Sequence, residues 1–154
     1  MSFVRAIAGR YVAGETPEEA LVVVKELNKK GFSATLDILG EHTKTAEAAV
    51  AITDQYAGLY EEIKKQGLDC NLSIKPTHIG LDIGENCVSE NLMKLLKKAA
   101  KTDNFLRIDM EDSTLTDQTI ELWNHCQMDY LKVGIVFQAY LYRTENDLKN
   151  LLKN

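Results

Sequence analysis

A polar residue recurs at a fixed interval in this 154-residue sequence, each time at the end of an apolar, strand-like segment. Glu41 follows ATLDILG, Lys75 ends NLSIK and Asp109 ends FLRID, so that both intervals are 34 residues. In a chain of alternating strands and helices, equal intervals return the backbone to the same edge of a parallel sheet. The spacing therefore predicts that these three ionisable side chains converge at the ends of neighbouring strands.

Helical segments alternate with the strand-like segments along the chain. The first helix has a clear start, because Thr16-Pro17-Glu18-Glu19 forms a capping box with proline at the first helical position. Gly31 is a natural stop for it. Further helices are expected at about residues 45–66, 89–100, 117–126 and 144–152, and short strands near Tyr11, Thr35, Ser73, Arg107 and Ile135.

Five strands that alternate with five helices are typical of an α/β fold with a parallel sheet. A (βα)8 TIM barrel of about 250 residues uses roughly 31 residues per unit. At that rate 154 residues hold about the first five βα units of such a barrel. We expect residues 1–154 to form a single unit of this kind, a partial barrel domain.

The alternation of side chains within the strands indicates a polar interior. Leu72 and Ile74 share one parity and would face the helices, whereas Ser73 and Lys75 share the other and would face the lumen. A polar lumen is costly unless its groups are paired or contact a ligand. The pattern leaves two interpretations open: a site for a polar ligand or large polar cofactor, or an internal ion-pair network among Asp37, Lys75, Arg107 and Asp109.

Composition excludes several classes of function. The net charge of −5 argues against a nucleic-acid partner. No apolar run approaches the roughly 18 residues of a membrane span, and no signal peptide is recognisable. The three widely spaced cysteines are interpreted as reduced, small buried residues. We therefore expect a cytoplasmic protein without a metal centre.

Lys75 and Asp109 are the strongest candidates for chemistry. Lys75 can hold a substrate carboxylate, act as a Schiff-base lysine with a depressed pKa, or simply pair with a neighbouring acid. Asp109 opens an acidic run that can orient a base or bind a cation, although Asp112 and Ser113 are more typical of turn and cap residues.

Four further polar residues lie near strand ends. Glu41 can form an ion pair across the barrel mouth, and Gln138 can bond the edge of a heteroaromatic ring. His42 and His78 are 36 residues apart, which is no metal signature, and both are expected to be exposed loop histidines.

Five segments together resemble consecutive blocks of the FAD-dependent proline dehydrogenase family. The resemblance extends from about residue 10 to residue 151 and is specific because the blocks occur in the family's order. The segments are RYVAGETPEEAL, ATLDILGE, NLSIKPTHIGLDI, LRIDMEDS and VGIVFQAYLYRTENDL.

The resemblance implies a distorted TIM barrel with FAD at the strand ends, which oxidises L-proline to Δ1-pyrroline-5-carboxylate and passes electrons to a quinone or other acceptor. It implies that Lys75 contacts the proline carboxylate, that Asp109 is the active-site aspartate, and that Glu41 belongs to an ion-pair gate. Met110 and Gln138 correspond to flavin-contacting positions. Peripheral attachment of the full enzyme to the inner membrane is the alternative to a purely cytoplasmic location.

The sequence departs from the family because the later barrel units, with their arginines for flavin and substrate, are missing from it. We expect a fragment that binds FAD poorly, is inactive alone and self-associates through open sheet edges. Two other functions remain open from the residues: a Schiff-base lyase that uses Lys75, and a non-catalytic partial-barrel module.

Overall fold

The computed structural model describes residues 12–153, and the strand expected near Tyr11 lies outside the described residues. The strands are β1 (Ala34–Leu36), β2 (Cys70–Ile74), β3 (Leu106–Ile108) and β4 (Val133–Ile135). The helices are α2 (Pro17–Lys29), α3 (Ala46–Gln66), α4 (Glu85–Thr102), the short η1 (Ser113–Leu115), α5 (Thr116–Asp129) and α6 (Thr144–Leu151).

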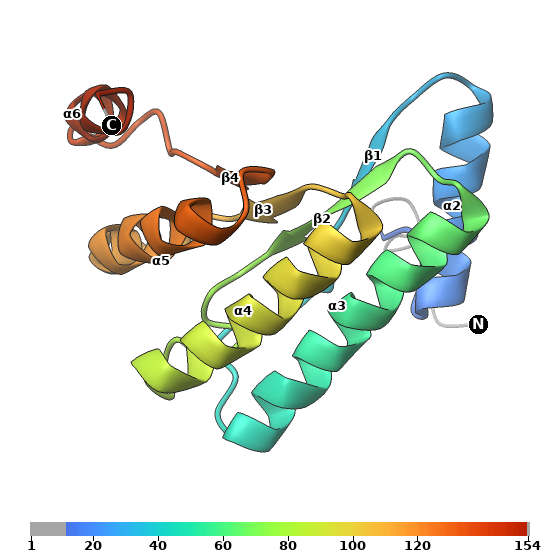
Figure 1. Ribbon diagram of the computed structural model, residues 1–154, viewed down its shortest axis with the longest axis horizontal. Helices are drawn as coiled ribbons and strands as arrows, with labels where there is room; N and C mark the ends of the chain where they lie inside the picture. Colours follow the sequence, from blue (N-terminus) through green and yellow to red (C-terminus); the bar gives the residue numbers. More distant parts are fainter. Residues whose placement is uncertain (1–11, 154) are drawn as a thin grey trace, which may run out of the picture.

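The four strands form one parallel sheet in the order β1-β2-β3-β4. Each strand is therefore hydrogen-bonded to its neighbour in sequence, and a helix lies between each pair, as a barrel-type βα repeat requires. In Figure 1, α3 and α4 lie side by side across the sheet, α2 lies beside β1, and α5 lies near β3 and β4.

Local signals account for both ends of α3 and for the start of α2. The side chains of Thr16 and Thr45 accept hydrogen bonds that cap α2 and α3, and Gly67 ends α3 in the left-handed conformation. α4 begins at Glu85, four residues before the predicted start. Its cap is Gly84, which has φ of +154° and no side-chain hydrogen bond, so the usual cap signal is missing from the sequence.

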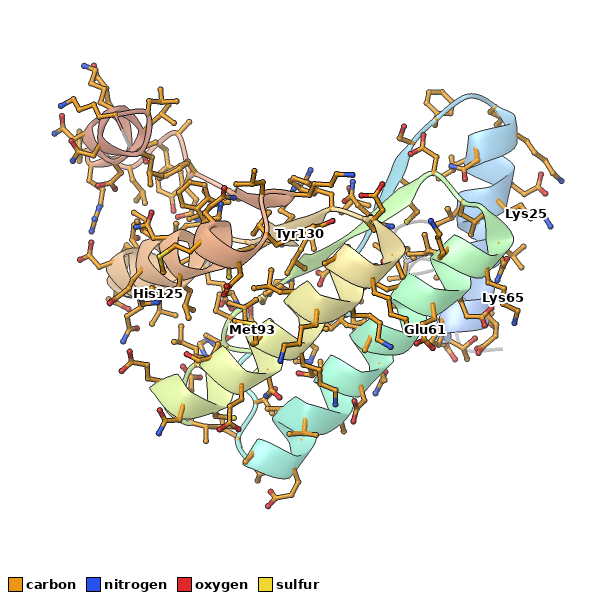
Figure 2. The ribbon with its side chains drawn as sticks, in the orientation of Figure 1. Lys25, Glu61, Lys65, Met93, His125 and Tyr130 are labelled. Carbon is orange, nitrogen blue, oxygen red and sulfur yellow. The ribbon has the colours of Figure 1, made fainter. Side chains whose placement is uncertain are left out.

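The core lies between the sheet and the two central helices. The side chains of Leu72, Ile74, Leu106 and Ile108 are completely buried and pack with Tyr56 of α3 and other helix residues. Charged residues cover the outer faces of the helices. Figure 2 shows Glu61 and Lys65 projecting from the exposed side of α3, and Glu61 forms an ion pair with Lys98 of α4.

The cysteine prediction holds for two of the three residues. Cys70 and Cys126 are buried, and burial raises the pKa of their thiols to about 11 and about 12. Cys87 is half-buried, and all three are free thiols. No helix among residues 12–153 is long and apolar enough to cross a membrane.

The leucines of α6 do not form a buried face. Leu148 and Leu152 are exposed, and no residue of α6 is fully buried. Figure 1 shows the reason, since α6 stands apart from the layer formed by α3, α4 and α5. The sequence thus predicted a helix at this position. It did not predict that the helix would bury none of its residues against the rest of the described chain.

Candidate functional site

Polar side chains of neighbouring strands meet on the face of the sheet opposite the apolar core. The register aligns Thr35 with Asn71 and Ser73 with Arg107. The Thr35 hydroxyl donates to Asn71 Oδ1 at 2.9 Å, and the Ser73 hydroxyl donates to Asp109 Oδ1 at 2.5 Å. The predicted alternation of polar and apolar residues is therefore observed in this sheet.

A hollow of about 600 Å³ opens at the carboxyl ends of these strands. All five residues predicted to form a site line it, and they come from four different strand ends. Its lining consists of Glu41, His42, Lys75, Asp109, Met110, Glu111, Asp112, Val136 and Gln138. The 34-residue interval thus does bring three ionisable residues to one place.

Lys75 is held by the carboxylate of Asp37, which follows β1. Lys75 Nζ lies 2.7 Å from Asp37 Oδ2, and both side chains are about one quarter exposed. The other carboxylate oxygen, Oδ1, accepts a hydrogen bond of 2.8 Å from the Tyr56 hydroxyl. Tyr56 is completely buried, and its hydroxyl also accepts from the backbone N–H of Ile38 at 3.0 Å. A core side chain therefore fixes the partner of the candidate substrate-binding lysine.

The surroundings of Lys75 keep its amine protonated. Burial alone would lower the pKa, but the hydrogen bond from Lys75 to Asp37 and the charges of Asp37, Asp109 and Glu111 outweigh burial and raise it. A Schiff-base lysine needs a depressed pKa to be a nucleophile at neutral pH. The charge balance therefore favours an ammonium that binds an anion over an amine that attacks a carbonyl.

The ion-pair network considered from the sequence is present only in part. Lys75 pairs with Asp37, whereas Asp109 accepts from Ser73. Arg107 forms no ion pair with another residue of the described chain, 12–153. The polar face therefore keeps charged groups that no ion pair among residues 12–153 neutralises, as a ligand site requires.

Only one of the two polar atoms of the Gln138 side-chain amide has a hydrogen-bond partner among the described residues. Its Nε2 donates to the backbone carbonyl of Glu111 at 2.9 Å, while its Oε1 is buried and has no hydrogen-bond partner within the described residues. Met110 is 7% exposed and places an apolar surface on the same hollow. An unpaired amide oxygen beside an apolar surface fits the N–H edge of a heteroaromatic ring.

The two loop histidines differ. His42 is exposed, as predicted, and its Nδ1 lies 2.7 Å from Asp82 Oδ2. The prediction of an exposed side chain is wrong for His78, which is 6% exposed. The loop after β1 folds over this ring so closely that a Cβ on Gly40, where φ is +150°, would lie 2.4 Å from His78 Nε2. Burial lowers the pKa of His78, whose Nδ1 has no partner among the described residues.

The His42–Asp82 pair gives a prediction for the dependence of stability on pH. The hydrogen bond to Asp82 raises the pKa of His42 above its ordinary 6.5, so the pair stabilises the fold below about pH 6.5 and is lost as pH rises through the folded pKa. We expect His42→Asn, which tolerates the positive φ of residue 42, to lower the urea midpoint at pH 6 but not at pH 9. Asp82→Asn should reproduce this profile, and a deficit independent of pH would contradict the assignment.

Other acidic and hydroxyl residues at the strand ends form hydrogen bonds beside the candidate site. Asp112 caps η1 through a hydrogen bond from the Thr114 N–H, as its sequence position indicated. Thr77 and Glu111, which the sequence analysis did not single out, are 34 residues apart and hydrogen-bonded to each other. The interval that pointed to Lys75 and Asp109 could have identified this pair as well.

No group of three or more His, Cys, Asp or Glu residues in the described chain is arranged to hold a metal ion. The fold and the hollow together define a barrel-type α/β protein with a polar site at the carboxyl ends of its parallel strands.

Comparisons with known proteins identify the family. A family model described as proline dehydrogenase matches residues 20–154. Proline dehydrogenase 1 of Bacillus subtilis subsp. natto is 38% identical over 144 residues, which cover 94% of this chain and 48% of that protein. Proline dehydrogenase of Deinococcus radiodurans is 32% identical, again over 94% of this chain and 48% of that protein. This chain belongs to the proline dehydrogenase family.

Two solved structures support the predicted fold class. Proline utilization A from Bdellovibrio bacteriovorus, inactivated by N-propargylglycine, matches with a TM-score of 0.83 at 25% identity, over 92% of this chain and 18% of that one. The proline utilization A structure from Corynebacterium freiburgense gives a TM-score of 0.80 at 22% identity, over 97% and 16% of the two chains. The (βα)8-barrel type is thus confirmed, and the chain spans about half the length of the curated relatives it matches.

Proposed function

We propose that residues 1–154 form the first part of a proline dehydrogenase barrel and supply its site for L-proline and FAD. The observation that carries the proposal is the convergence of Glu41, Lys75, Asp109 and Gln138 on one hollow in a chain of this family. We place the protein in the cytoplasm, with peripheral attachment to the inner membrane as the alternative, and propose that a quinone or another acceptor receives the electrons.

Lys75 binds the carboxylate of L-proline in this proposal. Its ammonium is protonated and is already oriented by Asp37 and Tyr56, so little further ordering is needed when the substrate binds. Asp109 is oriented by Ser73 and lies on the same hollow, where its carboxylate faces the charged groups of substrate and cofactor. Glu41, at the rim of the hollow, closes the site and excludes water.

Gln138 and Met110 would hold the isoalloxazine ring. The Oε1 of Gln138, which has no partner among the described residues, would serve as an acceptor for a ring N–H, and the Met110 side chain would offer an apolar surface to the ring. Bound FAD would supply the redox chemistry as the acceptor of a hydride from the proline carbon next to the ring nitrogen, and the nitrogen would release a proton, so that Δ1-pyrroline-5-carboxylate is the product. The chain's own residues bind, orient and shield the reactants.

A chimera tests the proposed function. The chain would replace the matching 144-residue region of Bacillus subtilis subsp. natto proline dehydrogenase 1, so that the rest of a barrel is present. We expect the purified chimera to carry stoichiometric flavin absorbance and to reduce a dye when L-proline is added. The 154-residue chain alone should hold little flavin and reduce no dye.

Two results would count against the proposal. A yellow, monomeric chimera that reduces no dye with L-proline would contradict the activity, and a folded but colourless chimera would contradict the cofactor assignment. Trapping of a carbonyl substrate on Lys75 by borohydride would instead support the Schiff-base lyase.

A further inference from the structure

Thr77 and Glu111 lie between the loops that carry the candidate site. Thr77 is two residues beyond Lys75 and completely buried, and Glu111 is two residues beyond Asp109. The Glu111 carboxylate binds Thr77 through both oxygens: Oε2 accepts from the Thr77 N–H at 3.0 Å, and Oε1 accepts from the Thr77 hydroxyl at 2.5 Å. The loop after β2 is thereby tied to the loop after β3.

The same threonine also holds the loop after β1. Its hydroxyl oxygen accepts from the backbone N–H of His42 at 3.0 Å, and its carbonyl accepts from the N–H of Thr43 at 3.2 Å. The Thr43 hydroxyl donates in turn to the carbonyl of His78 at 2.8 Å. The position of Glu41, directly before His42, therefore depends on the Thr77 hydroxyl.

Glu111 extends the connection to the fourth strand. Its backbone carbonyl accepts from Gln138 Nε2 at 2.9 Å, and this hydrogen bond leaves the Gln138 Oε1 free. Four loops that are far apart in sequence are thus joined by two residues. Hydrogen bonds to a carboxylate are stronger than those between neutral groups, so the Thr77–Glu111 pair holds the joined loops more firmly than neutral contacts would.

We propose that Thr77 and Glu111 are positioning residues, which together set the distances between Glu41, Lys75, Asp109 and Gln138. Both oxygens of the Glu111 carboxylate accept from Thr77, so this carboxylate is oriented toward the loop after β2. The effect on proline oxidation rests on the proposed function, whereas the effect on loop order does not. A misplacement of about 1 Å between reacting groups can lower a rate roughly 100-fold.

Two threonine variants separate the hydroxyl from the rest of the side chain. Thr77→Val keeps the shape but removes the donor to Glu111 and the acceptor for His42, whereas Thr77→Ser keeps the hydroxyl and loses only a methyl group. In the 154-residue chain we expect Thr77→Val to speed hydrogen exchange of the His42 amide roughly tenfold, as the loss of one hydrogen bond implies. The Thr43 amide should speed up less, because its acceptor, the backbone carbonyl of residue 77, remains. Thr77→Ser should restore slow exchange, and the amide of Leu95 in α4 should not change.

Glu111→Gln tests the Thr77–Glu111 hydrogen bonds independently, because it changes the acceptor and leaves Thr77 intact. It replaces one acceptor oxygen by an amide nitrogen, so we expect faster exchange of the Thr77 amide with α4 again unaffected. If Thr77→Val no longer unfolds cooperatively, Glu111→Gln still tests whether the Thr77–Glu111 hydrogen bonds order the loops. Unchanged exchange at residues 42, 43 and 77 in both variants, or equal effects of Thr77→Val and Thr77→Ser, would overturn the proposal.

The chimera supplies the second readout. We expect Thr77→Val to lower kcat for L-proline roughly tenfold with flavin content unchanged, and Thr77→Ser to recover most of it. An equal loss in the two variants would also overturn the positioning role. If the parent chimera has no activity, the proposed function fails. The exchange measurements still decide whether Thr77 and Glu111 order the loops.

Discussion

Replacing Lys75 with methionine in the flavin-loaded chimera is expected to lower kcat/KM for L-proline roughly 10- to 150-fold, the range for losing a hydrogen bond to a charged group. Methionine keeps much of the length and apolar stem of lysine but cannot pair with a carboxylate. The loss should appear mainly in KM, because the ammonium binds a group of the substrate that does not react. Steady-state dye reduction over a range of proline concentrations measures it.

Two controls separate this role from a structural one. L-prolinamide has no carboxylate, so the wild-type protein and Lys75→Met should handle it alike. Lys75→Arg retains the positive charge in a planar group that fits the space of an ammonium poorly, and an intermediate loss is expected. If Lys75→Met weakened proline and prolinamide equally, the variant would have disturbed Asp37 and Tyr56 and not a carboxylate site.

Truncation of Leu95 is expected to cause the largest loss of stability. Leu95 is completely buried in α4, where it packs in the main core. Leu95→Ala removes buried methyl groups and leaves a cavity, which costs about 2–5 kcal/mol of unfolding free energy. Because domains of this size are stable by only about 5–15 kcal/mol, this is a large fraction of the total.

Urea denaturation of the 154-residue chain measures this loss, and Leu148→Ala is the matched control. Leu148 is the same residue type in another helix, but it is 44% exposed. We expect the control to change the unfolding free energy by less than about 0.5 kcal/mol. Similar losses in both variants would show that α6 packs more tightly than the structure indicates, or that α4 packs less tightly.

The sequence predicted those parts of the fold that depend on neighbours in the chain. Thr45 and Gly67 mark the two ends of α3 because a cap is built from residues within one turn. Strand parity likewise predicted that Lys75 and Asp109 face away from the helices, since alternation is a property of each strand alone. The start of α4 was missed because Gly84 offers no side chain for a cap.

Features that depend on distant partners were not predicted. Tyr56 reads as one more apolar residue of a helix, and only the folded chain shows its hydroxyl on Asp37. His78 was expected to be exposed because a loop position says nothing about what folds over it, and Gly40 covers it. Convergence on one hollow was predictable from spacing, whereas the hydrogen bonds that orient each side chain were not.

The hydrogen bonds of Thr77 bear on how this kind of barrel can diversify. In many barrels the loops after the strands vary independently, and new specificities arise by exchange of whole loops. Here the hydrogen bonds of Thr77 join the loops after β1, β2 and β3 through the His42 N–H and the Glu111 carboxylate. A change in the length of any of these loops therefore displaces the others. Substrate preference in this lineage would therefore shift by single side-chain replacements within loops of constant length, and grafted loops would require matching partners.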